Sequence, residues 1–293
     1  MSEIDPIDAT SSELSRRAFV GLSAGVAAGA GTIARTLAAG SQLGHTHPPL
    51  VPDDDPGIAV ESVQLKLPDA SIAAYAAWPK IVRADTPGAV VVMHIWGVDT
   101  SIRDVVRRYA NEGYVVIAPD LYSRFQAPSG DGVSDIAVFR PFANRLQSEQ
   151  VDGDIRAAAL WIARSHPQAR VAITGFCMGG AIALRQALSN GDVFAVDAPF
   201  YGNPAGIDPA RVRMPVCGSY GQRDSSIPAA SVLAFRDALR TPNDIVIYPD
   251  AGHAFFDDQR ASFVPDAAAD AWRRTLAFFA KYLRVQTSKG STS

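Results

Sequence analysis

The chain has 293 residues, and 47% of them are hydrophobic, which is enough for a sizeable core. Its formal net charge is −3, with 27 Lys and Arg against 30 Asp and Glu, and no basic run lies beyond the N-terminal segment. This balance argues against nucleic acid as a partner, because phosphate binding requires concentrated positive charge.

The first forty residues are typical of an export signal. The pair Arg16-Arg17 follows a polar stretch and precedes a small, mildly apolar run, residues 21–33. This run is shorter and richer in Gly and Ala than a membrane-spanning helix, which needs ~20 strongly apolar residues. We interpret residues 1–40 as a twin-arginine signal and expect bacterial export machinery to carry the folded protein to the periplasm or the medium. The alternative is a flexible extension of a cytoplasmic enzyme.

A segment without periodicity, residues 41–57, follows the signal. Its Pro, Asp and Gly content predicts a linker that is mobile or lies along the surface. His45 and His47 could bind a metal weakly, but no further ligand cluster lies nearby, so we expect no metal and no cofactor. The next stretch, residues 58–285, suits one domain, and residues 286–293 are predicted to form a disordered tail.

Within that domain the hydrophobic pattern predicts an α/β fold. Residues 60–67 and 72–78 alternate polar and apolar side chains around a turn, as in an antiparallel hairpin at one edge of a sheet. Apolar strands and amphipathic helices then alternate, which is typical of a mostly parallel sheet with helices on both faces. The strands are expected at residues 89–94, 115–118, 171–174, 194–201, 212–220 and 244–248. The helices are expected at residues 102–111, 152–164, 181–184, 229–239 and 267–282.

The motif Gly-Phe-Cys-Met-Gly-Gly, residues 175–180, lies where an apolar strand runs into an apolar helix. Small residues two places before and after Cys177 are what a sharp strand-to-helix turn needs, so the motif predicts a nucleophile elbow. The turn would place the sulfur at a helix N-terminus, where backbone N–H groups favour the thiolate. The alternative is an inert buried cysteine. Cys217 lies in a predicted apolar strand, so we expect no disulfide.

An acid and a histidine follow Cys177 in the order that an α/β-hydrolase requires. Asp224 comes in the turn after the predicted strand at 212–220, and His253 follows the strand at 244–248. Because parallel strands end at the same edge of a sheet, both side chains are expected near Cys177. Taken alone, Asp224 would be interpreted as a turn-forming residue and His253 as a surface loop residue. Together with Cys177 they predict a Cys-His-Asp triad.

The segment at residues 123–150 is the least regular part of the domain, yet it is too aromatic for a purely solvent-facing loop. We expect it to cap the cleft and to contribute to an apolar substrate pocket. The pocket residues predicted from the sequence are Trp96, Tyr201 and Phe255, with His94 and Arg124 as polar features.

These segments together resemble the dienelactone hydrolase family, also called the carboxymethylenebutenolidase family, within the α/β-hydrolase superfamily. The resemblance covers roughly residues 58–283. It is carried by residues 90–98, 113–122, 175–180, 221–224 and 251–255.

The resemblance implies a thiol hydrolase that cleaves small-molecule esters or lactones and needs no cofactor. It makes Cys177 the nucleophile, His253 the general base and Asp224 the carboxylate that orients it. The backbone N–H groups of Ile95 and Met178 would form the oxyanion hole. We expect a monomer or a weak homodimer.

Two positions depart from the family pattern. His94 stands where members usually carry a glutamate that helps to activate the nucleophile, so His94 either pairs with the thiol or only bonds locally. The loss of that glutamate also leaves open a non-catalytic binding or scaffold protein on the same fold. Family members that act on dienelactone bind its carboxylate with two arginines; Arg124 matches one, but Asp257 stands at the other, so we expect neutral substrates.

Overall fold

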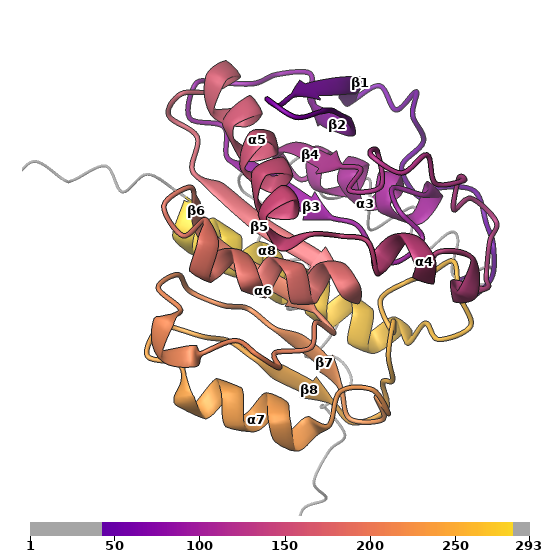
Figure 1. Ribbon diagram of the computed structural model, residues 1–293, viewed down its shortest axis with the longest axis vertical. Helices are drawn as coiled ribbons and strands as arrows, with labels where there is room; N and C mark the ends of the chain where they lie inside the picture. The colour runs from indigo at the N-terminus through magenta and orange to yellow at the C-terminus, as the bar shows by residue number, and fades with distance from the viewer. Residues whose placement is uncertain (1–42, 284–293) are drawn as a thin grey trace, which may run out of the picture.

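The computed structural model of the chain describes residues 43–283 (Figure 1). The predicted signal at residues 1–40 and the predicted tail at residues 286–293 lie outside the described residues. Among the helices within 43–283, none is both long and apolar enough to cross a membrane.

An eight-stranded sheet forms the centre of the domain, in the order β1-β2-β4-β3-β5-β6-β7-β8. The two N-terminal strands pair antiparallel with each other, and β2 pairs antiparallel with β4, whereas all later neighbours are parallel. The predicted edge hairpin and the mostly parallel sheet are confirmed. The strands are β1 (Ile58–Lys66), β2 (Ser71–Pro79), β3 (Gly88–Val92), β4 (Val115–Pro119), β5 (Val171–Phe176), β6 (Phe194–Phe200), β7 (Ser219–Gly221) and β8 (Val246–Tyr248).

Helices cover both faces of this sheet, and Figure 1 shows α5 and α6 on the near face with α8 behind. On the far face, Tyr109 of α3 packs against Trp272 and Phe279 of α8, with ring centroids 4.4 and 5.9 Å apart. The strands β3, β4 and β5 are buried along their whole length, because a parallel sheet covered on both faces needs apolar side chains on both. The helices are α3 (Thr100–Asn111), α4 (Arg140–Ala143), α5 (Ser148–Ser165), α6 (Met178–Ser189), α7 (Ala229–Ala238) and α8 (Pro265–Leu283), with 3₁₀ turns η1 (Ile136–Val138) and η2 (Pro209–Arg211).

The strand predicted at residues 212–220 is shorter than expected. Only β7 pairs regularly, and Val216 makes isolated bridges to Asp197 and Asn243. Pro215 interrupts the run because proline has no N–H to donate to a neighbouring strand. The sheet edge that carries Asp224 nevertheless forms where the sequence predicted it.

The described part of residues 41–57, which we predicted to be a linker that is mobile or lies along the surface, has exposed residues but also packs against the domain. His47, Leu50 and Val51 are buried, and Val51 has no exposed surface. The backbone N–H groups of Leu50 and Val51 donate to the carboxylate of Asp104 in α3, at 3.1 and 2.8 Å. We call residues 44–51 the N-terminal strap. Its burial could not be predicted from its own composition, because the residues that bind it lie far away in the sequence.

Candidate active site

Cys177 occupies a strained turn between β5 and α6, with φ +56° and ψ −117°. Non-glycine residues rarely adopt a positive φ, and such strain is found where a side chain must be presented in one direction. A Cβ on Gly175 would lie 2.2 Å from the carbonyl oxygen of Gly179, and a Cβ on Gly179 would lie 2.4 Å from that of Met93. Only glycine fits at either flank, so the motif forms the elbow that the sequence predicted.

His253 and Asp224 lie together at the same edge of the sheet. The Nδ1 atom of His253 is 2.6 Å from Oδ2 of Asp224, whose other oxygen accepts the backbone N–H groups of Ser226 and Ile227 at 2.8 and 3.1 Å. Burial lowers the pKa of His253, but its hydrogen bond to Cys177 and the charges of Cys177 and Asp224 outweigh this and raise the pKa to about 9. The arrangement therefore favours a protonated His253 imidazole beside the Cys177 sulfur near neutral pH.

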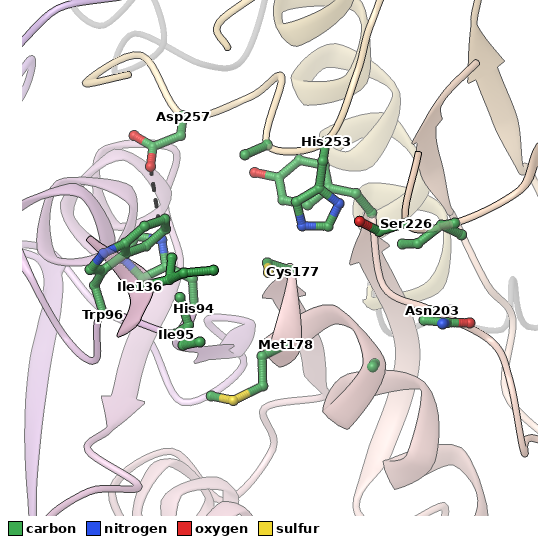
Figure 2. A pocket seen from close by; sticks show the side chains of 14 residues that line it. His94, Ile95, Trp96, Ile136, Cys177, Met178, Asn203, Ser226, His253 and Asp257 are labelled. Atoms are coloured by element: carbon green, nitrogen blue, oxygen red, sulfur yellow. Dashed lines mark ion pairs between the residues drawn. The ribbon is translucent and has the colours of Figure 1, made fainter. Parts of the chain in front are cut away.

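The two predicted oxyanion-hole residues line the cavity near Cys177 and come from different elements (Figure 2). Met178 begins α6, and Ile95 lies in the loop after β3, where Gly97 has a φ of +82° and donates to the carbonyl of His94 at 3.1 Å. The hydroxyl of Tyr122 donates to the carbonyl of Ile95 at 2.9 Å and so fixes this loop. Neither amide has a hydrogen-bond partner within residues 43–283, so both are available to a substrate oxygen.

A cavity of about 370 Å³ opens in front of Cys177. Trp96 and Ile136 lie on one side of the sulfur in Figure 2, and Asn203 and Ser226 lie on the other. Of the pocket residues predicted from the sequence, His94, Trp96 and Tyr201 line this cavity. Asn203 and Ser226 were missed, because a polar residue in a loop carries no periodic signal.

His94 is buried between two carboxylates. Its Nε2 lies 2.9 Å from Oδ1 of Asp99, and its Nδ1 lies 3.8 Å from Oδ2 of Asp257, the contact drawn as a dashed line in Figure 2. The ring also meets Trp96 edge-on at 5.0 Å between centroids. Nε2 has no hydrogen-bond partner of good geometry within the described residues, so these are close contacts with carboxylates and not hydrogen bonds. Because both nitrogens face carboxylates, the geometry favours a local role for His94 over a pair with the thiol.

Asp257 lines the pocket, but other groups already bind its charge. The hydroxyl of Ser101 donates to Oδ1 at 2.9 Å, and Nε of Arg260 donates to Oδ2 at 2.9 Å. Arg260 also stacks over Trp96, with its guanidinium carbon 3.4 Å from the ring centroid. Sequence reasoning missed Arg260, and no motif pointed to it. Its charge weakens the repulsion that we expected Asp257 to exert on an anionic substrate.

Two predicted pocket residues lie elsewhere. Arg124 is held by Asp154 and Asp69, with nitrogen–oxygen distances of 2.5 and 3.0 Å, and it does not line the cavity. Burial lowers the pKa of Arg124, but the hydrogen bonds and charges of these carboxylates outweigh this effect, so the pKa lies above its ordinary value. Phe255 has no exposed surface and packs behind Tyr201, with ring centroids 5.5 Å apart. The sequence indicated neither carboxylate partner, because Asp69 and Asp154 follow no recognisable spacing from Arg124.

The segment at residues 123–150 caps the site only in part. Ile136 of η1 lines the cavity, whereas Phe139 is buried against Tyr122, with ring centroids 6.3 Å apart. The chain passes so close to the loop after β3 at Gly130 that a Cβ there would lie 2.0 Å from the carbonyl oxygen of Trp96. The segment therefore supports that loop more than it contacts a substrate.

A strained cysteine at a strand–helix turn, with an acid and a histidine after later strands of a mostly parallel sheet, defines an α/β-hydrolase. Residues 72–283 match the dienelactone hydrolase family. The chain belongs to this family.

Relatives of similar length support the assignment. A Salmonella typhimurium protein named "Putative carboxymethylenebutenolidase" is 37% identical over 250 residues, which cover 80% of this chain and 92% of that protein. An Escherichia coli K12 protein of the same name is 38% identical over 224 residues, which cover 71% of this chain and 82% of that protein. A crystal structure from Klebsiella pneumoniae, named "Putative Dienelactone Hydrolase", is 36% identical, covers 77% of this chain and 99% of its own, and superimposes with a TM-score of 0.70.

Proposed function

We propose that the protein is a thiol hydrolase that cleaves the ester or lactone bonds of small molecules through Cys177, His253 and Asp224. The observation that carries this proposal is the strained backbone of Cys177 directly beside the His253–Asp224 pair. A reactive thiolate needs a neighbouring cation, and a histidine base needs a third group to orient it.

The reaction would proceed in two halves. The thiolate of Cys177 attacks the carbonyl carbon, and the backbone N–H groups of Ile95 and Met178 stabilise the negative charge that develops on the oxygen. The carbon–oxygen bond then breaks, and His253 donates its proton to the leaving alkoxide, which leaves a thioester on Cys177. In the second half, His253 takes a proton from water as the water attacks the thioester, and the acid departs as the thiolate reforms.

The cavity supports a preference for uncharged substrates. Arg124 is already paired with two carboxylates outside the cavity, and Arg260 is bound to Asp257. Among the described residues that line the cavity there is no Lys or Arg, so a substrate carboxylate would find no unpaired cation. Apolar walls at Ile95, Trp96 and Ile136 suit a hydrocarbon group instead.

The nucleophile is tested by replacing it. Cys177→Ala should abolish hydrolysis of p-nitrophenyl acetate, and Cys177→Ser should reduce it strongly, because an alcohol is far harder to deprotonate than a thiol. Cys217→Ser is the matched control, since burial raises the pKa of that thiol to about 11 and keeps it inert. Wild-type turnover by either Cys177 variant would refute the assignment. Failure of iodoacetamide to label Cys177 near pH 6 would favour the non-catalytic alternative.

We also infer export through the twin-arginine route, on the strength of the sequence pattern at residues 1–40. Cleavage near Ala39 would leave the N-terminal strap intact, because the strap begins at Gly44. Replacing Arg16 and Arg17 together with Lys should retain the precursor in the cytoplasm, and fractionation of expressing cells measures this. Equal amounts of processed wild type and variant in the periplasm would contradict the inference.

A further inference from the structure

The loop that follows His253, residues 254–264, is part of the active-site wall. Ala254 and Asp257 both line the cavity, and Ala254 has a φ of +60°, which non-glycine residues rarely adopt. Such a conformation persists only where the surroundings fix it. Because Ala254 is bonded directly to His253, a shift of this loop would move the imidazole relative to Cys177.

The N-terminal strap is hydrogen-bonded to this loop, and residues 44–51 do not line the cavity. The backbone N–H of Gly44 donates to the carbonyl of Asp258 at 2.7 Å, and the N–H of His47 donates to Oε1 of Gln259 at 3.0 Å. The amide of Gln259 donates back to the carbonyl of His47 at 3.1 Å. These bonds join two segments from opposite ends of the chain.

A buried pair of charges strengthens the same contact. The Nε2 atom of His47 lies 3.4 Å from Oδ1 of Asp258, and its Nδ1 lies 2.6 Å from the carbonyl oxygen of Pro48. Both neighbours are acceptors, so the ring satisfies them best with a proton on each nitrogen. His47 and Asp258 are 5% and 3% exposed, so neither is well screened by solvent.

The helix α3 closes this network. Nη2 of Arg108 donates to Asp258 and to Asp104, each at 2.5 Å. Asp104 in turn accepts the backbone N–H groups of Leu50 and Val51. The strap is therefore fixed at one end by the loop and at the other by α3, and Arg108 connects the two fixed points.

Resting on the hydrolase function proposed above, we propose that the N-terminal strap is a positioning element of the active site, in which His47 and Asp258 hold the loop that orients His253. Neither side chain lines the cavity, so neither contacts the substrate. They act through the backbone of residues 254–258.

The contact depends on pH in a defined direction. The hydrogen bond to Asp258 raises the pKa of His47 above its ordinary value of 6.5, burial opposes this, and the charge of Arg108 from α3 also opposes it. A histidine with a raised pKa stabilises the folded contact fully below its ordinary pKa, and this stabilisation is lost as pH rises through the raised value. The strap should therefore hold the loop most firmly in mildly acidic solution.

The full-length chain carrying His47→Ala tests the proposal. We expect kcat for p-nitrophenyl acetate to fall at least fivefold at pH 6, with a smaller change in KM, because the imidazole loses its position while the pocket stays open. Hydrogen–deuterium exchange of residues 254–264 should become at least tenfold faster well below the melting temperature. His45→Ala is the matched control, since His45 is exposed in the same segment, and it should match wild type.

A second variant distinguishes a positioning role of His47 from a general loss of folding. His47→Gln can still donate one hydrogen bond to Asp258, so we expect partial recovery of kcat and a weaker dependence of the loop exchange on pH. If both variants only lower the melting temperature and leave kcat, KM and the loop exchange unchanged, the positioning role is refuted. If wild type hydrolyses no ester, the proposed function fails, and the exchange measurement then decides the positioning role by itself.

Discussion

Asp224 orients the imidazole of His253 through a short side-chain hydrogen bond. Its carboxylate holds Nδ1 at 2.6 Å, and two backbone N–H groups fix the carboxylate in turn. A positioned carboxylate selects the histidine tautomer and stabilises the imidazolium. The residue can therefore be removed without changing the shape of the site, if an amide replaces the acid.

Asp224→Asn should lower kcat by about 10²–10⁴, by analogy with the loss of the orienting acid in other triads. The variant should also alkylate more slowly with iodoacetamide at pH 6, because His253 holds its proton less well without the carboxylate. Asp250→Asn is the control, since the Asp250 side chain is 78% exposed and pairs with Arg223 at the surface. Unchanged kinetics in Asp224→Asn would separate Asp224 from catalysis.

The pKa of His253 predicts the alkaline limit of the reaction. Because its contacts with Cys177 and Asp224 raise the pKa of His253 to about 9, the imidazolium that protonates the leaving group is lost as pH rises through that value. We expect kcat/KM for a neutral ester to fall above about pH 9 and the limit to move to lower pH in Asp224→Asn. A profile that is flat from pH 6 to 10 would contradict this.

Asp197 is a buried acid that the proposed chemistry does not use. It lies in β6 with no exposed surface, and neither oxygen has a hydrogen-bond partner of good geometry within the described residues. Burial raises the pKa of Asp197 well above its ordinary value, and the amide of Ala198 offsets little of this. An acid with a raised folded-state pKa costs stability as pH rises above its unfolded-state pKa of about 3.9.

Asp197→Asn should therefore stabilise the protein increasingly as pH rises. Each 1 kcal/mol recovered corresponds to about 2–4 °C in melting temperature for a domain of this size. Thermal unfolding at pH 5 and pH 8 measures the difference, with Asp237→Asn at an exposed position as the control. A gap between variant and wild type that does not widen from pH 5 to pH 8 would contradict the prediction.

At the scale of elements, the contact between β3 and α6 sets the distance between the two proposed oxyanion donors. Gly179 makes this approach possible, because a Cβ there would lie 2.4 Å from the carbonyl oxygens of Val92 and Met93. Gly179→Ala should push α6 from β3 and separate the amide of Met178 from that of Ile95. We expect a loss of about 10² in kcat, the size of effect seen when one oxyanion donor is removed.

We expect the same glycine-to-alanine substitution to leave kcat unchanged in a helix without such close contacts. Gly153 lies inside α5, and a Cβ there would meet only Leu67 at an ordinary 3.7 Å. Gly153→Ala should leave kcat unchanged and stabilise the protein by about 0.5–1 kcal/mol, because alanine loses less conformational freedom in a helix. Equal kinetic losses in both variants would show that the elbow is not the cause.

Elements with strong local signals were predictable from the sequence. The apolar runs of β3, β4 and β5 and the glycines around Cys177 identify their own structures, because burial on two faces and a sharp turn each restrict the residue types. The strap was not predictable. Its anchors, Asp104 and Arg108, lie on α3, and a polar segment that is buried by distant partners has the composition of a linker.

At the scale of the whole molecule, the site was predictable where chain order and strand ends determine position, as for Asp224 and His253. The ion pairs between residues far apart in the sequence were not predictable. Arg124 matches the family pattern, yet Asp69 and Asp154 bind it outside the cavity. Arg260 matches no pattern, yet it reaches Asp257 and Trp96 at the pocket wall.

This distribution of charge predicts which substrates the molecule prefers. A carboxylate entering the cavity would lose water, approach Asp257 and find Arg260 already bound to Asp257. No new ion pair would then offset the free-energy cost of its desolvation. We expect kcat/KM for neutral short-chain esters or unsubstituted lactones to exceed that for dienelactone by tenfold or more. Arg124→Gln should leave this ratio unchanged, because Arg124 stabilises the fold outside the cavity. A ratio near one, or a ratio that moves with Arg124, would refute the prediction and return Arg124 to substrate binding.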